Sequence, residues 1–581
     1  MNLNSDLSLP TTRWKHPESD ISIQDILSHE LQIDPILAQI LINRSIRNSV
    51  DAKLFLAPSL LALHNPFLMK DMKKGVNRLI KAIYNREKMM IYGDYDADGI
   101  TSVAILYKFL QRINVDVHYR IPNRFSEGYS LNRTAIDEIK ASGASLILTV
   151  DCGVSDYEHV DYASSQGIDI IVLDHHEIPE KLPKAAAVIN TNRTDCQFPF
   201  KSLAGVGIVF NFLIALRGEL RTQNFWNDQT YPNLRDYLDL VALGTIGDIV
   251  PLLDENRIFA KIGLDLINEG KNIGLQALKE VGGIDHQPVD SGTASYNLIP
   301  RLNAAGRIAS AEDALKLLLT EDRSEALNLA RKLESYNRER QLMERNILDE
   351  IFKEIAAYQN LNNCGLLFFS SENWHPGVIG IVASRLVDIY YRPAILISLK
   401  NGIGKGSGRS IAEFNLHESL SKCQHLLLAH GGHRYAAGLS IKEEEIAKLK
   451  SDLEEMVSRE VEFETLFPKT AIDAQCNMGQ IKYDLISQLK LLGPFGNKNP
   501  EPVLCIRNAM VGTSSIVGHN HLTMRISADG SSCNSIWFNK GHLCSQVSGA
   551  RFDIVFTPQI NRWNGGAQLQ LKMRDMALIR V

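Results

Sequence analysis

The 581-residue sequence lacks the features that mark several classes of protein. No uninterrupted apolar run approaches the roughly 18 residues that a membrane-spanning helix needs. The first twenty residues, MNLNSDLSLPTTRWKHPESD, have no apolar core like that of a secretory signal peptide. The eight cysteines are scattered, and no pair has the CxxC spacing of a zinc or redox site. We therefore expect a cytoplasmic protein with reduced thiols and no contact with a membrane.

The sequence also lacks an excess of positive charge, since its formal net charge is -5. That alone would argue against a nucleic-acid partner, because Lys and Arg replace the counterions of phosphates. The charge is uneven, however: residues 391–440 carry a net +4 and residues 481–581 a net +6, which leaves -11 for residues 1–480. Basic charge is thus concentrated in two segments, and a nucleic acid could bind there.

Residues 88–190 alternate short apolar runs with helical periodicity. We expect helices through Ile105 to Leu110 and near 154–166. Repeated strand–helix–strand units predict a mostly parallel sheet covered by helices. The expected strands are MMIYG, SLILTV, IDIIVL and AAAVIN.

The rest of the chain divides into three further parts. Leucines and isoleucines at helical intervals predict a long connecting helix near 324–357, and α/β character returns over 364–440. Five short strands then suggest a small barrel: PVLCIR, HLTMRIS, NSIWF, FDIVF and AQLQLKM. We predict five parts, over 1–70, 71–322, 323–357, 358–467 and 468–581.

The sharpest local feature is GDYDADG at 93–99, which follows an expected strand and precedes an expected helix. Three carboxylates at alternate positions in a tight turn repel one another, and a metal ion would relieve this. The pattern also begins like an EF-hand loop, but the twelfth residue from Asp94 is Ile105 rather than an acid. A calcium loop is therefore excluded.

Two further strands end in potential ligands, Asp151 and Asp174-His175-His176, and Asp248 stands in the apolar stretch GTIGDIVPL. A lone Asp after a strand is commonly a helix N-cap, but ligand sites form beyond the carboxyl ends of parallel strands, where these residues converge. Carboxylates with imidazole suit Mn²⁺ or Mg²⁺. Two such ions about 3.5–4 Å apart would activate water and hold both oxygens of a phosphoryl displacement.

These motifs resemble those of the DHH phosphoesterase superfamily: GDYDADG, DCG, DHH and the Asp of GTIGDIVPL, in that order. Four more, PRLNAAGR, WHPGVIG, GSGRS and GGHRYAAG, resemble its RecJ family of single-strand-specific exonucleases. The resemblance runs from about residue 40 to the C-terminus. It implies a parallel-sheet DHH domain and a smaller α/β DHH-associated domain joined by the long helix, with an OB-fold as the C-terminal β-barrel.

The resemblance also implies roles for single residues. Asp151 would be the carboxylate shared between two ions. Asp94 would orient a ligand, His176 would donate to the scissile phosphate, and Asp174 could fix the histidine pair. The implied direct ligands of two Mn²⁺ or Mg²⁺ ions are Asp96, Asp98, Asp151, His175 and Asp248.

We expect the nucleic-acid strand to bind on glycine-rich loops, where backbone amides and guanidinium groups can approach its phosphates closely. The candidates on such loops are Lys405, Ser407, Arg409 and His433. Arg301 and Arg307, which flank LNAAG, and Arg124 in NRFSEGYS are further candidates for holding the 5′ phosphate. In the barrel, bases could stack on rings interleaved with cations, although most such rings fill a core. The segments concerned contain Trp537, Phe538, Lys540, Phe552, Phe556, Arg562 and Trp563.

The resemblance thus implies a monomeric exonuclease that degrades single-stranded DNA from the 5′ end to 5′-mononucleotides, in recombination and repair. Helicase and single-strand-binding protein would be its partners. Two alternatives stay open. One is a DHH phosphodiesterase acting on short oligonucleotides or cyclic dinucleotides, which the basic C-terminal segment disfavours. The other is a noncatalytic replication scaffold that keeps the fold, which would bind strands without hydrolysing them.

Overall fold

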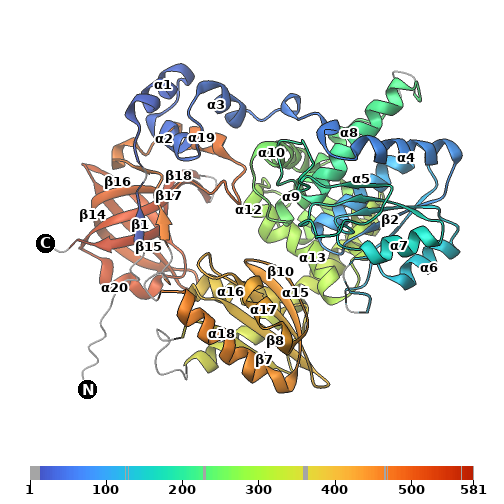
Figure 1. Cartoon of the computed structure of the whole chain (residues 1–581). Helices are drawn as coiled ribbons and strands as arrows, with labels where there is room; N and C mark the ends of the chain where they lie inside the picture. Colours follow the sequence, from blue (N-terminus) through green and yellow to red (C-terminus); the bar gives the residue numbers. More distant parts are fainter. Residues whose placement is uncertain are drawn as a thin grey trace.

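The computed structural model describes residues 13–579, apart from 17, 125, 129, 227–230, 357–363, 463–465, 467–468 and 564–565. It has two α/β domains joined by a long helix, and a C-terminal barrel (Figure 1). Within these residues, none of the helices combines the length and apolar character that crossing a membrane requires. The predicted fold class is confirmed.

The catalytic candidate motifs lie on a five-stranded parallel sheet of order β3-β2-β4-β5-β6. Successive residues of β2 contribute to two different cores, because side chains alternate between the faces of a strand. The strands are β2 (Met89–Gly93), β3 (Val117–Arg120), β4 (Leu146–Val150), β5 (Asp169–Leu173) and β6 (Ala187–Ile189).

Helices cover both faces of this sheet, as the alternating pattern predicted. One face packs against α4 (Met72–Asn85), α5 (Ala97–Arg112) and α8 (Gly205–Thr222), and the other against α6 (Arg133–Ala141) and α7 (Tyr157–Ser165). A helical segment completes the domain with α9 (Leu238–Gly247), α10 (Asp254–Glu269), α11 (Ile273–Val281), α12 (Ser291–Thr293), α13 (Ile299–Ile308) and α14 (Glu312–Leu319).

The predicted connecting helix is α15 (Arg323–Ala356), which is 34 residues long. Its first half packs in the core of the parallel-sheet domain and its second half in the core of the next domain. The second domain has a mixed sheet of order β10-β11-β9-β8-β7. Its elements are β7 (Leu367–Ser371), α16 (Ile379–Tyr390), β8 (Ala394–Lys400), β9 (Ile403–Arg409), α17 (Leu416–Lys422), β10 (Leu427–His433), β11 (Ala436–Lys442) and α18 (Ile446–Glu460).

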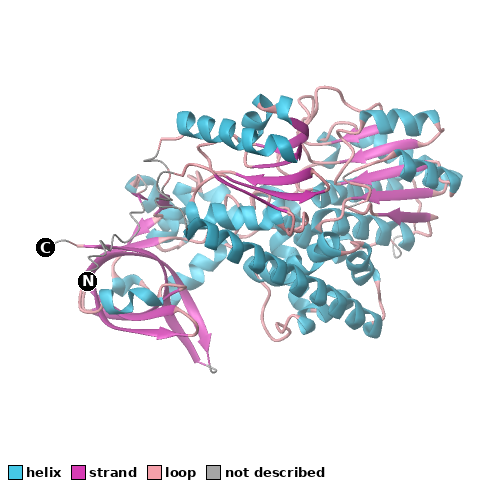
Figure 2. Cartoon of the chain, turned by 90° about the horizontal axis from the view of Figure 1, so that it is seen from below, coloured by secondary structure: helices cyan, strands magenta, loops and turns pink. Residues whose placement is uncertain are grey.

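All five predicted C-terminal strands are present, and pairing of the first with β17 closes them into the barrel seen almost end-on in Figure 2. They are β14 (Leu504–Val517), β15 (His521–Ala528), β16 (Ser531–Trp537), β17 (Arg551–Trp563) and β18 (Gly566–Leu578). Trp537, Phe552 and Phe556 are buried in the barrel core, whereas Phe538 is 46% exposed. The side chains of Arg562 and Trp563 lie outside the described part.

The N-terminal region packs against this barrel, which the sequence did not indicate. Buried residues of α1 (Ile21–Leu31), α2 (Pro35–Asn43) and α3 (Ser49–Leu56) share one apolar core with the barrel strands. The short strand β1 (Arg13–Lys15) pairs in parallel with β12 (Lys469–Ala471). The two ends of the chain therefore form one structural unit, visible as the blue and red region of Figure 1.

Candidate metal centre and strand-binding cleft

Three strands of the parallel sheet end at the same edge, and each is followed by an aspartate, so that the three carboxylates lie close together. Asp94 follows β2, Asp151 follows β4, and Asp174 follows β5. The parallel register of β2, β4 and β5 sets their carboxyl ends side by side. Asp248 reaches the same place from the C-terminal end of α9.

The ligand atoms form three overlapping groups, in each of which all atoms lie within 4.8 Å of one another. Asp151 and His175 each belong to two groups, so they occupy the centre. The groups are Asp94 with Asp96 and Asp151; Asp98 with His175 and Asp248; and Asp151 with His175 and His176. All seven predicted metal and catalytic residues are thus brought together.

Local backbone geometry fixes the first acids. Asp96 is the N-cap of α5, where one of its oxygens accepts the amide N–H groups of Asp98 and Gly99 at 2.9 and 3.1 Å. The carboxylate of Asp98 accepts those of Gly205 and Val206 at 2.6 and 2.8 Å. The start of α8 therefore orients Asp98. A Cβ on Gly205 would lie 2.8 Å from Asp151 Oδ1, so a larger residue would displace the cluster.

Carboxylates position both histidines of the cluster: Asp151 and Asp248 lie beside His175, and Asp174 lies beside His176. Nε2 of His175 lies 3.1 Å from Asp151 Oδ1 and 3.5 Å from Asp248 Oδ2. Nδ1 of His176 lies 2.7 Å from Asp174 Oδ1. Asp174, which is 1% exposed, also accepts the amide N–H groups of Val154 at 2.9 Å and of His175 at 2.7 Å. Asp174 therefore fixes the histidine pair.

The electrostatics of the cluster fit divalent cations. Burial, reinforced by repulsion from neighbouring acids, raises the pKa of Asp94 and Asp151 well above the ordinary range. Burial and the Asp248 charge raise the pKa of Asp98 to about 7. Burial likewise raises the pKa of Asp248 to about 6. Buried acids at this density ionise together only beside positive charge, and oxygen ligands with imidazole match Mn²⁺ and Mg²⁺.

A cleft of about 500 Å³ lies between the two α/β domains beside this centre. Tyr95, Arg124 and Arg307 line it from the catalytic domain. Residues of β9 face them from the second domain, and among these are Lys405, Ser407 and Arg409. Five of the seven predicted strand-binding residues therefore share one cavity.

The arginines of this cleft are placed for an anion. Burial and the nearby Arg124 lower the pKa of Arg307 to about 10, and the same two causes lower the pKa of Arg409. Arg409 Nη1 donates to Ser407 Oγ at 3.2 Å. Because these guanidinium groups repel one another, a phosphate between them would be stabilised.

The other two predicted strand-binding residues have different surroundings. The Arg301 guanidinium is buried, with Nε 2.8 Å from a Glu334 oxygen on α15 and Nη1 donating to the Asn297 carbonyl at 2.6 Å. It joins two helices rather than lining the cleft. His433, at the end of β10, lies 3.2 Å from the Glu177 carboxylate of the catalytic domain.

Two residues of the site, Tyr95 and Asn303, were not predicted individually. The guanidinium of Arg124 lies 5.1 Å from the centre of the Tyr95 ring, which lines the cleft. The side-chain oxygen of Asn303 accepts the Ala97 amide at 2.7 Å and so supports the first turn of α5. Both lie inside recognised motifs, but motif membership alone does not reveal a contact.

Comparison with known proteins agrees with this geometry. The sequence matches the DHH family N-terminal domain over residues 88–245, the DHHA1 domain over 362–459 and the RecJ OB domain over 472–575. The single-stranded-DNA-specific exonuclease RecJ of Bacillus subtilis is 39% identical over 97% of this chain and 71% of its own length. The Escherichia coli protein of that name is 35% identical over 86% of this chain and 89% of its own length.

Comparison with solved structures also finds RecJ proteins. The crystal structure of RecJ from Thermus thermophilus in complex with Mn²⁺ has a TM-score of 0.84 and 28% identity, covering 98% of this chain and 80% of its own. The corresponding structure with Mg²⁺ has a TM-score of 0.78 and 27% identity, covering 98% and 79%.

Proposed function

The chain belongs to the RecJ family of DHH phosphoesterases, and on that basis we propose that it is a metal-dependent exonuclease acting on single-stranded DNA. The observation that carries this is the adjacency of a buried acid–imidazole cluster to a cleft lined by arginines. We propose hydrolysis in the 5′-to-3′ direction that releases 5′-mononucleotides, with a role in recombination and repair.

The cofactors are Mn²⁺ or Mg²⁺ ions. We propose that Asp151 is shared between two of them, because it belongs to two ligand groups. Bound there, the ions would activate water for attack on phosphorus and neutralise the charge that develops on the phosphate. The proposed direct ligands are Asp96, Asp98, Asp151, His175 and Asp248.

The chain's own side chains prepare the reaction. Burial disfavours the imidazolium form of His176, but the hydrogen bond with Asp174 outweighs it and raises the pKa of His176 to about 9. His176 is therefore an imidazolium at neutral pH, and its Nε2–H would donate a hydrogen bond to an oxygen of the scissile phosphate and stabilise the charge there. Asp94 would orient the neighbouring ligands, since it groups with Asp96 and Asp151.

The cleft residues would hold the terminal phosphate of the strand. Arg307 and Arg409 provide the guanidinium donors, and Arg124, Lys405 and Ser407 surround them. His433 would reach the strand beyond this cavity. A strand held by its 5′ end beside the cluster presents its first phosphodiester for hydrolysis, which accounts for the proposed polarity.

A phosphodiesterase for short oligonucleotides or cyclic dinucleotides would need the two α/β domains alone. The barrel, whose sequence matches the RecJ OB domain and whose segment 481–581 has a net charge of +6, favours a longer substrate. We further propose that the enzyme is monomeric and cytoplasmic and works with a helicase and a single-strand-binding protein.

The full-length protein tests this function against the noncatalytic alternative. Incubated with Mn²⁺ and a single-stranded oligonucleotide, it should release mononucleotides, whereas a blunt duplex of the same sequence should persist. Asp96→Ala should still bind the strand but not cleave it. A wild-type protein that binds the strand without hydrolysing it would favour the scaffold function and overturn the proposal.

A further inference from the structure

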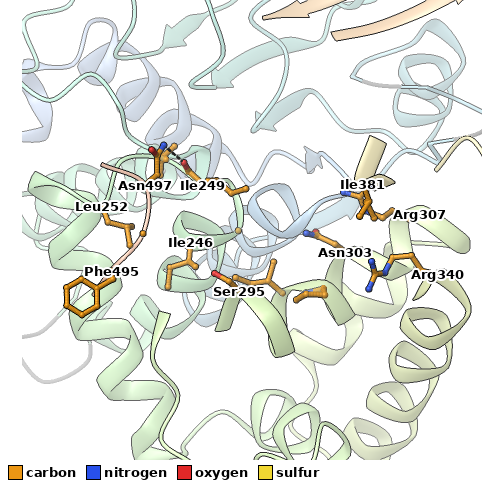
Figure 3. Close-up of a pocket in the computed structure, with 15 residues that line it drawn as sticks. Ile246, Ile249, Leu252, Ser295, Asn303, Arg307, Arg340, Ile381, Phe495 and Asn497 are labelled. Atoms are coloured by element: carbon orange, nitrogen blue, oxygen red, sulfur yellow. Dashed lines mark hydrogen bonds between the residues drawn. The ribbon is translucent and has the colours of Figure 1, made fainter. Parts of the chain in front are cut away.

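A loop of the C-terminal part of the chain contacts the turn that carries Asp248. The side-chain amide of Asn497 donates a hydrogen bond to the carbonyl of Ile249 at 2.7 Å (Figure 3, dashed line). The amide N–H of Leu252 donates to the backbone carbonyl of Asn497 at 2.9 Å. These two bonds bracket the segment between α9 and α10, directly after Asp248.

This turn needs support from outside. Ile249 has a φ of +59°, a left-handed conformation that is unfavourable for a β-branched residue. Its side chain is 70% exposed, so packing of that side chain contributes little to holding the conformation. Strained residues persist where surrounding contacts determine them, and they gather at functional sites. The bonds to Asn497 are contacts of this kind.

A pocket of about 380 Å³ lies beside the turn (Figure 3). Ile246 at the end of α9 and Ile249 in the turn line it on one side, and Phe495 lines it from the loop. Arg307 and Arg340 contribute polar groups to its wall. The amide N–H of Asp248 donates to the carbonyl of Gly244 at 2.9 Å, and the side chain of Asn256 donates to the carbonyl of Pro251 at 3.0 Å, so both ends of the turn are held within the catalytic domain. Between them, on the side that faces the pocket, the Asn497 contact is the bond that reaches Ile249 from another part of the chain.

The loop itself is anchored on the catalytic domain. Arg257 of α10, which is 2% exposed, donates to the carbonyls of Leu491 at 2.9 Å and Leu492 at 2.7 Å. The buried side chain of Asn499 donates to the carbonyls of Leu492 at 2.9 Å and Pro494 at 2.7 Å. Asn497 therefore lies on a loop that is held by hydrogen bonds of residues on both sides of it.

We propose that Asn497 is a positioning residue of the metal centre, which acts by fixing the turn that carries Asp248. The loop around it, although it leads into the strand-binding barrel, is then also part of the scaffold of the catalytic site. This inference rests on the proposed function, since it takes Asp248 as a metal ligand. It extends that function by assigning a C-terminal residue to the assembly of the site.

The test compares full-length wild-type protein with Asn497→Ala. A hydrogen bond contributes modestly to stability, so removing this one should weaken Mn²⁺ binding about 2- to 10-fold, measured by calorimetry without DNA. It should lower kcat by a similar factor and leave KM for single-stranded DNA unchanged. Asn497→Gln keeps the amide donor and should recover most of both losses. Gln546→Ala removes an exposed amide on the barrel and serves as the matched control.

Unchanged Mn²⁺ affinity and kcat in Asn497→Ala would overturn the inference. A raised KM for long strands with unchanged Mn²⁺ affinity would also overturn it, because the loop would then serve only to dock the barrel. Wild-type protein that binds Mn²⁺ but hydrolyses no DNA would refute the proposed function instead. The calorimetric comparison of the variants would still decide the role of Asn497.

Discussion

His176 Nδ1 lies 2.7 Å from Asp174 Oδ1, and this pair sets the charge of both groups. Burial opposes ionisation of Asp174, but the hydrogen bond from His176, its charge and the backbone donors outweigh burial and lower the pKa of Asp174 to about 2. The same pair raises the pKa of His176 against its burial. The second histidine of the DHH motif is thereby kept protonated and oriented at the edge of the metal centre.

Asp174→Asn should impair catalysis more than binding. The amide keeps the shape of the side chain but loses the charge that holds the His176 proton. Loss of a partner behind a metal-site histidine typically costs about 10- to 100-fold in activity, so we expect a fall of that size in kcat with little change in KM. Steady-state kinetics checks this, with exposed Asp161→Asn on α7 as control. A kcat within twofold of wild type would contradict the assigned role.

The metal-free protein should lose stability as the pH rises. Folding raises the pKa of Asp98 to about 7 and that of Asp248 to about 6, mainly through burial. An unfolded carboxyl titrates near about 3.9, so the folded state binds more protons between about pH 4 and 7, and its stability falls across that window.

Thermal unfolding in EDTA at several pH values measures this effect. The fall should be steeper for wild type than for Asp98→Asn, and Mn²⁺ should reduce it by compensating the ionised carboxylates. A wild-type slope no steeper than that of the variant, or a slope that Mn²⁺ leaves unchanged, would show that these acids are not the cause.

Arg409→Ala should remove recognition of the strand terminus. Arg409 is one of three arginines in the cleft, and a phosphate there relieves their repulsion. We expect kcat/KM for a 5′-phosphorylated strand to fall at least about 10-fold, in line with the loss of a charged hydrogen bond. The preference for a 5′-phosphate over a 5′-hydroxyl should fall with it.

Competition assays with the two substrates measure this preference. Lys448→Ala, on the exposed surface of α18, is the control for loss of one positive charge. An unchanged preference in Arg409→Ala would place recognition of the terminus elsewhere.

Phe538→Ala should weaken the binding of long strands selectively. Phe538 is 46% exposed, so part of its ring is accessible to a base, and it makes a T-shaped contact with His521, with ring centroids 5.1 Å apart. A base–aromatic stack contributes about 1–3 kcal/mol. Fluorescence anisotropy should therefore show a loss of about 5-fold or more with long strands and none with very short ones. Equal losses on both lengths would argue against a stacking role in the barrel.

Much of the catalytic site could be predicted because parallel strands impose their own geometry. Acids at the ends of β2, β4 and β5 had to meet at one edge of the sheet, whatever the loops between them did. The five short strands of the barrel were also predictable from their apolar runs and the turn residues between them, whereas the pairing of β14 with β17 that closes the barrel was not. The predictable features are local and periodic, so the sequence carries them directly.

Contacts between distant segments were not predictable in this way. Nothing near Arg301 marks Glu334 as its partner, so its motif suggested a strand contact where the structure has a buried ion pair. The packing of the N-terminal helices on the barrel joins opposite ends of the chain. The sequence predicted only a separate N-terminal part over residues 1–70. The contact of Asn497 with Ile249 is equally invisible in the sequence.

The central claim is that this chain removes nucleotides from the 5′ end of single-stranded DNA with divalent metal. The most direct measurement is digestion of one oligonucleotide carrying a label at either the 5′ or the 3′ end, with Mn²⁺ and with EDTA. With Mn²⁺, labelled mononucleotide should appear at once from the 5′-labelled strand and only late from the 3′-labelled one, and EDTA should abolish both. Early release from the 3′ label, or cleavage in EDTA, would contradict the account.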